Sequence, residues 1–397
     1  MDVYVSDISS VQLLRRARGR CWPRVEECLD RTVGVPSSLR SQWWRDGIAE
    51  LAPLLTIDER HPLHLHVSCE ERRIRARPIE CDILSPVLPE GSFMLAVLSE
   101  SGSSVRIDSG GLSFGQLAGK LARAERRGDL SRAQARALLI DFGMELTGNY
   151  ARNEVNPLTD DCYFFVGRAT SADGIRMWCD NACRVRGAKY ARRISRDVMD
   201  GSQSPRETLH AIILSSPPEL GGLGLERPLL NVPLQLSSQE RLLINGPSMC
   251  PDLYFPDLGF AIEHQGGPHG TSAQYAEDAS RSQVYAALGI TLFETSRRDV
   301  WSAAAYDIFL HRLIHRLAAD HGTRLGRRLT EIVDDPVSRR TRWSVIDVLT
   351  DGTLFVCASG TVPRAGPRDT PPSYARLSRT RTTSLCRTSR SRARCDP

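Results

Sequence analysis

The sequence has almost no lysine, no long hydrophobic run and no closely spaced cysteine pair. Of its 52 basic residues only Lys120 and Lys189 are lysines and the other 50 are arginines, a skew typical of a GC-rich genome. No stretch approaches the roughly 18 apolar residues that a membrane helix needs. The first residues carry neither the basic nor the apolar segment of a secretory signal. We therefore expect a cytoplasmic protein with no membrane partner.

The eleven cysteines are scattered along the chain without a CxxC pair. Cys179 and Cys183 alone cannot complete a four-ligand zinc site. An odd cysteine count without a secretion signal indicates reduced thiols, several of them buried. Zinc is therefore not an expected cofactor.

Length and charge distribution together indicate several regions. With 397 residues, 41% hydrophobic and 25% charged, the chain is long enough for two globular domains. Residues 361–397 carry nine arginines against two aspartates, so the formal charge of +5 combines a local +7 with −2 elsewhere. We expect a mixed α/β region over 1–200, an α/β domain over 201–320, an extension with a hairpin over 321–360, and a disordered arginine-rich tail over 361–397.

Two motifs stand out in the first 200 residues. Leu63–Val67 alternates with the period of a strand, and Ser131 is the expected cap of a helix that ends near Gly143. His64 and His66 share one face of that strand and could ligate a metal, but no cluster of partner ligands follows them. We favour two ordinary half-buried histidines.

A basic helix is expected between Cys183 and Arg196. Lys189, Arg192, Arg193 and Arg196 recur at i, i+3, i+4 and i+7, with apolar residues on the opposite side. Such a row of cations can contact nucleic-acid phosphates. It is also routine on a solvated helix face, which is the interpretation that we favour.

Residues 204–317 predict the element order α-β-β-β-α-β-α. Ser204-Pro205-Arg206-Glu207 marks a helix start, with a serine cap, a proline at the first helical position and a glutamate three residues after the cap. The later elements are a short apolar strand over 229–236, a hairpin over 251–266 with its turn at Pro256–Gly259, a helix over 272–288, a strand over 290–295 and a final helix from Asp299.

The hairpin carries a candidate site. Glu263 and Gln265 share one face of its second strand because side chains alternate along a strand, and Asp252 can lie opposite them. Two carboxylates and an amide oxygen suit a hard divalent cation, so we expect Asp252 and Glu263 to bind Mg²⁺ or Mn²⁺. Glu207 is either a capping glutamate or a further catalytic group. His269, in the loop after the hairpin, is either a general base or phosphate contact, or an exposed loop residue.

A second hairpin is predicted over 344–356. Two apolar runs, Ser344–Leu349 and Leu354–Val356, flank Asp351-Gly352, a dipeptide that favours tight turns.

Together these motifs resemble the restriction-endonuclease-like PD-(D/E)XK superfamily, in the very-short-patch-repair-like branch found in many actinobacterial proteins. The matching positions are Ser204-Pro205-x-Glu207, Asp252-Leu253-x-Phe255-Pro256, Ile262-Glu263-His264-Gln265-Gly266, His269 and Asp278-x-x-Arg281. Gly143–Tyr150 also resembles a segment of the N-terminal region of such two-part proteins. On spacing alone, Asp278 and Arg281 are most simply a surface pair.

The resemblance implies a metal-dependent DNA endonuclease, a hydrolase of phosphodiester bonds in repair or defence. Asp252 and Glu263 would hold the metal, Gln265 would ligate or orient water, and His269 and Glu207 would assist. Gln265 departs from the family, which usually has Asp or Lys there. The alternative is therefore a nuclease-fold module with weak or no catalysis that binds DNA or a partner, like an antitoxin-type regulator. The sequence leaves the substrate and the oligomeric state open.

Overall fold

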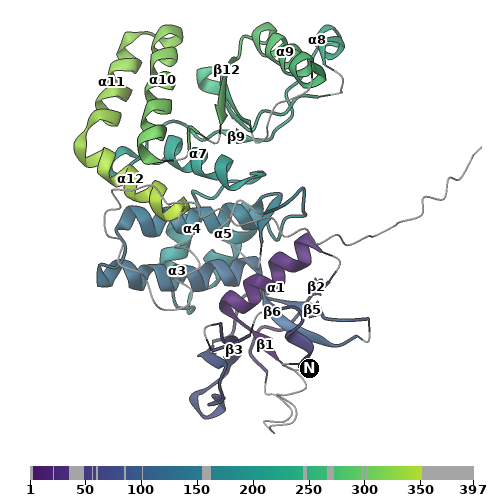
Figure 1. Cartoon of the computed structure of the whole chain (residues 1–397). Helices are drawn as coiled ribbons and strands as arrows, with labels where there is room; N and C mark the ends of the chain where they lie inside the picture. Colours follow the sequence, from purple (N-terminus) through teal and green to yellow (C-terminus); the bar gives the residue numbers. More distant parts are fainter. Residues whose placement is uncertain are drawn as a thin grey trace, which may run out of the picture. The chain divides into compact units, whose positions relative to one another are not determined.

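The computed structural model describes residues 3–20, 22–34, 49–55, 57–59, 61–84, 86–100, 102–153, 162–244, 248–265, 272–296, 298–300 and 302–350. They belong to one compact unit, which spans residues 1–364. The unit is a mixed α/β structure, as the sequence predicts (Figure 1). Among the described residues no helix has the length and apolar character to cross a membrane. The predicted disordered tail and the Asp351-Gly352 turn lie outside the described residues.

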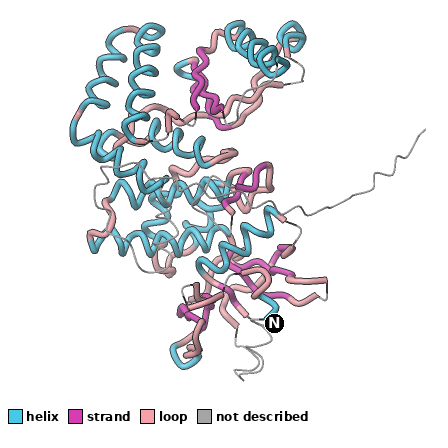
Figure 2. Tube along the Cα trace, viewed as in Figure 1, coloured by secondary structure: helices cyan, strands magenta, loops and turns pink. Residues whose placement is uncertain are grey.

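A six-stranded sheet, in the order β2-β5-β6-β1-β3-β4, belongs to the N-terminal region (Figure 2). Its strands are β1 (Tyr4–Val5), β2 (Arg24–Glu27), β3 (Leu63–Val67), β4 (Ile79–Ile83), β5 (Phe93–Val97) and β6 (Ser104–Asp108). β1 is parallel to β6 and β3 is parallel to β4, whereas the other neighbours are antiparallel. Leu63–Val67 forms the predicted strand, but all five residues are buried, with α1 (Asp7–Gly19) packed against them. His64 and His66 are therefore buried rather than half-buried.

Helices dominate the rest of this region and pack against one another. They are α3 (Gly110–Arg127), α4 (Arg132–Thr147), α5 (Ala172–Asn181) and α6 (Ala188–Ser195), accompanied by a hairpin of β7 (Tyr150–Arg152) and β8 (Cys162–Phe164). Ser131 caps α4 as predicted, in a reciprocal capping box with Gln134. The helix continues past Gly143, which serves close packing instead: a Cβ there would lie 2.6 Å from Val198 and 2.9 Å from Phe114.

A second sheet, in the order β12-β11-β10-β9, lies in residues 201–320. Its elements are α7 (Pro205–Ser215), β9 (Leu229–Leu230), α8 (Ser238–Leu243), β10 (Leu253–Phe255), β11 (Phe260–Gln265), α9 (Ser272–Ala287), β12 (Thr291–Ser296) and α10 (Ala303–His321). β11 is parallel to β12 and antiparallel to β10, which is antiparallel to β9. The observed order is the predicted one with the short helix α8 added. Single 3-10 turns occur at Glu70–Arg72, Pro218–Leu220 and Pro256–Leu258, the last of which closes the predicted hairpin turn.

The two faces of β11 contact different cores. Ile262 is fully buried in the large core, whereas Ala261 packs in a smaller core with side chains of α9. Because side chains alternate along a strand, Glu263 falls on the α9 face and His264 on the opposite face.

Helices α11 (Thr323–Asp334) and α12 (Pro336–Thr350) complete the described chain, and α11 packs along α10 (Figure 1). The predicted strand Ser344–Leu349 is wrong, because these residues lie in α12. The hairpin expected over 321–360 is therefore replaced, in its described half, by helix.

The start and the apolar spacing of α12 explain the difference. Pro336 takes the first helical position, and Asp335 Oδ2 accepts the N–H of Ser338 at 2.7 Å. Arg342 and Ile346 recur at helical spacing and are buried. Tertiary packing of this stripe outweighs the strand preference of the short β-branched run.

Candidate functional site

Three carboxylates approach one another where α7 meets the β10–β11 hairpin. The hairpin pairs Leu253 with Ile262 and, continued by one residue, puts Asp252 opposite Glu263. Opposite residues of an antiparallel pair point to the same face, so both carboxylates belong to one face of the sheet. Glu207, in the first turn of α7, lies close enough for the charge of Asp252 to act on it.

Glu207 is held by several donors at the start of α7. Ser204 caps the helix as predicted and accepts the N–H of Glu207 at 3.2 Å. The Glu207 carboxylate accepts from the Ser204 hydroxyl at 2.9 Å, from the Gln203 N–H at 2.8 Å and from Asn231 Nδ2 at 2.7 Å. The residue is only 5% exposed. Its carboxylate therefore does more than cap a helix, because it also ties α7 to the end of β9.

Asn231 connects Glu207 to the strand that carries Asp252. Its N–H donates to the carbonyl oxygens of Pro251 and Asp252 at 3.1 and 3.2 Å. Its φ of +54° lies in the left-handed region that asparagine tolerates better than most residues. Asp252 Oδ2 in turn accepts the N–H of His264 at 2.7 Å, which fixes the carboxylate across the ladder. Sequence reasoning missed Asn231, because nothing but its place after a strand marks it.

Burial and mutual repulsion raise the pKa of two of the three acids. Burial raises the pKa of Glu207 to about 7, and the charge of Asp252 adds to the rise. Burial likewise raises the pKa of Asp252 to about 6; the N–H of His264 lowers it and the charge of Glu263 raises it. Asp252 therefore interacts electrostatically with each of the other two acids. The three groups do not bring all their ligand atoms within 4.8 Å of one another, so direct bridging of Asp252 and Glu263 by a metal stays a prediction.

Glu263 is paired with a cation from α9. Its Oε1 accepts from the Arg281 guanidinium and from the Tyr285 hydroxyl, the latter at 2.5 Å. The side chains of Arg281 and Glu263 are 30% and 17% exposed, so the pair is partly shielded from water. Arg281 therefore pairs with β11, and the predicted surface pair with Asp278 is not tested, because the side chain of Asp278 lies outside the described residues. The missed signal is that Arg281 and Tyr285, at i and i+4, share one face of the helix.

A chain of hydrogen-bonding groups lies on the other face of β11. His264 Nδ1 is 3.0 Å from Thr295 Oγ1, which is 3.4 Å from His210 Nε2. His210 Nδ1 is 2.9 Å from the Tyr306 hydroxyl, and Arg206 donates to His264 Nε2 at 2.8 Å. Burial, together with the charges of His264 and Arg206, lowers the pKa of His210 to about 3, so this imidazole is neutral. This series of hydrogen bonds links α7, β11, β12 and α10 on the face of β11 opposite Glu263. Sequence reasoning overlooked His210.

Two candidates fall partly or wholly outside the described residues. Gln265 ends β11, where its backbone pairs with Ser296 of β12. The side chain of Gln265 and all of His269 lie outside the described residues.

The four basic residues of α6 and its end divide into two kinds. Arg192 turns back to α5, where it donates to the carbonyl oxygens of Cys179 and Asp180 at 3.0 and 3.1 Å. Lys189, Arg193 and Arg196 are exposed. Arg192 is therefore held against α5 by hydrogen bonds, whereas no such bond to α5 holds Lys189, Arg193 or Arg196 among the described residues.

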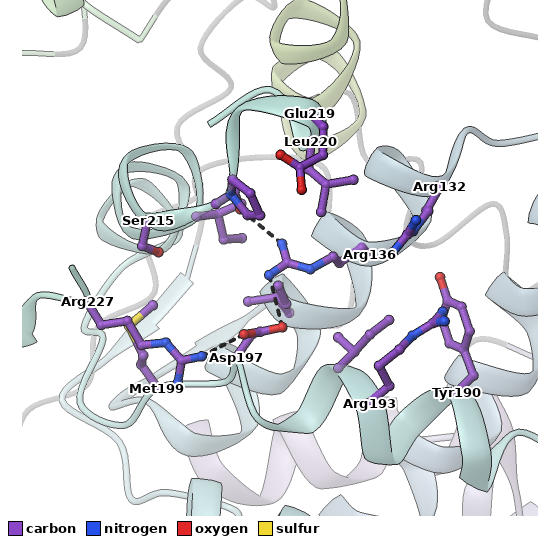
Figure 3. Close-up of a pocket in the computed structure, with 15 residues that line it drawn as sticks. Arg132, Arg136, Tyr190, Arg193, Asp197, Met199, Ser215, Glu219, Leu220 and Arg227 are labelled. Atoms are coloured by element: carbon purple, nitrogen blue, oxygen red, sulfur yellow. Dashed lines mark hydrogen bonds and ion pairs between the residues drawn. The ribbon is translucent and has the colours of Figure 1, made fainter. Parts of the chain in front are cut away.

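Arg193 also lines a cavity of about 420 Å³ between α4, α6 and the end of α7 (Figure 3). Six of its fifteen lining residues are charged, four arginines against two acids: Arg132, Arg136, Arg193, Arg227, Asp197 and Glu219. Arg136 is held by Asp197 at 2.9 Å and by Ser216 Oγ at 3.0 Å. The excess positive charge suits an anionic group such as a phosphate.

No family model, curated protein or solved structure matches the chain. The function is therefore inferred from the chemistry of these sites.

Proposed function

We propose that residues 201–320 act as a metal-dependent DNA endonuclease of the restriction-endonuclease-like type, in repair or defence. The observation that carries the proposal is the approach of Glu207 in α7 to Asp252, just before β10, and of Asp252 to Glu263 in β11. Carboxylates that repel one another and are largely removed from water cost stability, which favours a functional reason for the arrangement. In a phosphodiester hydrolase, such carboxylates would serve to bind the catalytic metal ion.

The donor set fits a hard divalent cation. Asp252 and Glu263 would supply carboxylate oxygens to Mg²⁺ or Mn²⁺, the ligands that both ions prefer. Such an ion would neutralise the scissile phosphate and lower the pKa of a bound water.

The remaining groups would position and accept protons. The N–H of His264 holds Asp252 in place, and Asn231 holds Glu207. With a pKa of about 7, Glu207 is suited to accept a proton from an attacking water near neutral pH. Gln265 would orient the water and His269 would assist, as the family pattern implies.

The arginine-lined cavity provides a place for substrate phosphate. Glu207 and Ser216 stand nine residues apart along α7 and its end, about 14 Å at 1.5 Å per residue. A DNA strand carries a phosphate about every 3.4 Å along the axis, so a bound strand would reach from the carboxylates to the cavity within about four nucleotides. Arg193 would then contact the backbone there.

The Arg281–Glu263 pair favours a second candidate, a catalytically weak or inactive regulator that binds DNA. A guanidinium that already neutralises Glu263 replaces the charge that a metal would provide. If the pair persists in the presence of Mg²⁺, the module would bind nucleic acid without cutting it.

The decisive experiment is cleavage of supercoiled and mismatch-bearing DNA in Mg²⁺ or Mn²⁺. We expect nicking by the wild type and a loss of at least 100-fold in Glu263→Ala. Asp257→Asn, an exposed carboxylate at the turn of the same hairpin, is the matched control and should cut like the wild type.

Gln265→Asp separates the two candidates further. It restores the residue usual in the family and adds a full charge beside the metal, so it should raise metal affinity or cleavage. If neither the wild type nor Gln265→Asp cuts, although both melt cooperatively, the regulator is the correct assignment.

A further inference from the structure

A second cluster of possible metal ligands lies far from the proposed nuclease site in the sequence. Among the residues that the structure describes, Asp7, His64 and Asp82 form the group whose three ligand atoms all lie within 4.8 Å of one another. Asp82 is exposed, the Asp7 side chain is 11% exposed and His64 is 4% exposed. The cluster is therefore open to solvent on one side and buried on the other.

Strand register places these groups on one face of the N-terminal sheet. β3 and β4 run parallel, with His64 beside Glu80 and His66 beside Asp82. Side chains two residues apart on a strand point to the same face, and so do neighbouring side chains of paired strands. All four of these residues therefore lie on one face of the sheet. Asp7 begins α1, which packs against β3.

His64 is the buried group that points to a ligand. Its Nδ1 lies 3.8 Å from Asp7 Oδ2 and 3.8 Å from Glu80 Oε2, too far for a hydrogen bond to either. The imidazole makes no hydrogen bond to any described residue, whereas the backbone of His64 is bonded: its N–H donates to Ser9 Oγ at 3.1 Å and its C=O accepts the N–H of Ser6 at 2.9 Å. The ring therefore faces two carboxylates across a gap of 3.8 Å.

The backbone of Asp7 is held in an unfavourable conformation that brings it to the cluster. Its φ is +54°, which is uncommon for a residue other than glycine. Its N–H donates to Asp108 Oδ2 at 3.1 Å, and the same carboxylate bonds His66 Nε2 at 2.9 Å. Buried Asp108 thus fixes both the start of α1 and the histidine next to the cluster.

We propose that Asp7, His64 and Asp82 bind a divalent transition-metal ion, with Glu80 available as a fourth ligand. Donors about 2.1 Å from an octahedral ion lie about 3.0 Å apart when adjacent and about 4.2 Å apart when opposite. The 3.8 Å separations of His64 Nδ1 from Asp7 and Glu80 fall between these values, and Asp82 has a ligand atom within 4.8 Å of those of Asp7 and His64. One imidazole with carboxylates is a mixed donor set that suits Mn²⁺, Fe²⁺ or Zn²⁺.

Lys120 competes with a metal ion for the carboxylate of Asp7. This residue, one of only two lysines in the chain, forms an ion pair with Asp7 Oδ2, and its side chain is 20% exposed. An ammonium there balances part of the charge of Asp7, Glu80 and Asp82 when no ion is bound. Removing it should strengthen metal binding, whereas removing a ligand should weaken it.

The test uses the full-length chain carrying Asp252→Asn and Glu263→Gln, which removes ligands of the proposed nuclease site and keeps the two proposals separate. Mn²⁺ is the probe because the many thiols of the chain bind this ion weakly. The protein is first stripped of metal with a chelator, which is then removed. Mn²⁺ is added, and the loss of the electron paramagnetic resonance signal of the free ion measures how much is bound.

We expect one Mn²⁺ per chain, at least tenfold weaker binding in His64→Ala and in Asp82→Asn, and several-fold tighter binding in Lys120→Met. His61→Ala, which removes an exposed histidine paired with Asp58, is the control and should bind like the parent. Asp82 is exposed, so Asp82→Asn tests the site even if His64→Ala fails to fold. No bound Mn²⁺ in the parent, or equal affinity in the parent and Asp82→Asn, overturns the proposal.

Discussion

The raised pKa of Glu207 makes the stability of the fold depend on pH near neutrality. Its pKa is raised from an ordinary value of 4.5 to about 7 by burial and by Asp252. Between these two values the folded protein holds a proton that the unfolded chain has released. The contribution of Glu207 to stability is therefore fully present below about pH 4.5 and is lost as the pH rises through about 7.

Glu207→Gln tests this titration directly. A glutamine cannot ionise, so the variant should lose less stability than the wild type between pH 5 and pH 8. The expected difference is on the order of 2–3 kcal/mol, at 1.36 kcal/mol for each unit of pKa shift. Urea unfolding at the two pH values measures it, with Asp257→Asn as the control. Equal pH dependence of wild type and Glu207→Gln would mean that Glu207 ionises normally.

Arg281 decides how readily Glu263 can serve a metal. If a cation takes Glu263 in the nuclease site, the guanidinium has to leave, and Arg281→Met should raise Mn²⁺ affinity by several-fold. The measurement belongs in an Asp82→Asn background, so that the N-terminal cluster does not contribute. Arg312→Met, which removes an exposed cation paired with Asp299, is the matched control. Weaker Mn²⁺ binding in Arg281→Met would show that the arginine supports the site instead of competing for it.

At the level of elements, a buried ionic network joins α1, α4 and β7. Glu145 of α4 accepts from Arg15 Nε and Nη2 at 2.7 Å each and from Arg152 Nη1 at 2.7 Å. Arg152 also donates to both carboxylate oxygens of Asp141 at 2.9 Å. These four side chains are nearly inaccessible to water. Burial alone would raise the pKa of Glu145, but the two arginines lower it to about 2.

Replacing Glu145 by glutamine should destabilise the fold severely. The change leaves two buried guanidinium groups with only Asp141 to balance them, and breaking a buried pair in this way costs about 3–5 kcal/mol. Chemical denaturation at pH 7 measures the loss, and Glu90→Gln, an exposed glutamate, should change stability by less than about 0.5 kcal/mol. In the wild type this contribution is present above about pH 4.5 and is lost as the pH falls towards 2. A decrease in the free energy of unfolding of less than about 1 kcal/mol in Glu145→Gln would show that the network contributes little to stability.

Local signals allowed the elements near the site to be predicted, and non-local packing accounts for the errors. The caps of α4 and α7 depend on a few adjacent residues, and Ser131 and Ser204 carry them in the sequence itself. The β-branched run within α12 predicts a strand, but the buried stripe that includes Arg342 and Ile346 makes this segment a helix. The roles of Arg281 and His210 depend on contacts with distant strands, which no single-sequence spacing reveals.

At the scale of the whole molecule, the N-terminal network extends to the candidate site through hydroxyl groups. The Tyr150 hydroxyl lies 3.2 Å from Thr208 Oγ1, which lies 2.8 Å from Ser202 Oγ. Thr208 follows Glu207 on α7. The start of α7, which carries a site carboxylate, is therefore anchored to the N-terminal region at Thr208.

Charge is divided unevenly over the molecule, and this division predicts how the proposed binding to DNA depends on salt. Residues 361–397 hold a net charge of +7, whereas the rest of the chain is at −2. A chain truncated after Gly360 should therefore bind DNA more weakly, and its affinity should depend less on salt. Each phosphate contact that is lost reduces the slope of log affinity against log salt by about 0.9. Filter binding or fluorescence anisotropy between 50 and 300 mM salt measures that slope.

The same truncation should leave the thermal midpoint nearly unchanged, because the compact unit with the described helices and sheets ends at Arg364. It separates two sources of DNA affinity, the tail and the arginines of α6 and the cavity. If the salt slope is unchanged in the truncated chain but falls in Arg193→Met, the structured surface is the main contact. If the slope of log affinity against log salt drops by several units on truncation and Arg193→Met leaves it unchanged, the tail supplies the DNA binding. The cavity would then bind an anion other than DNA phosphate.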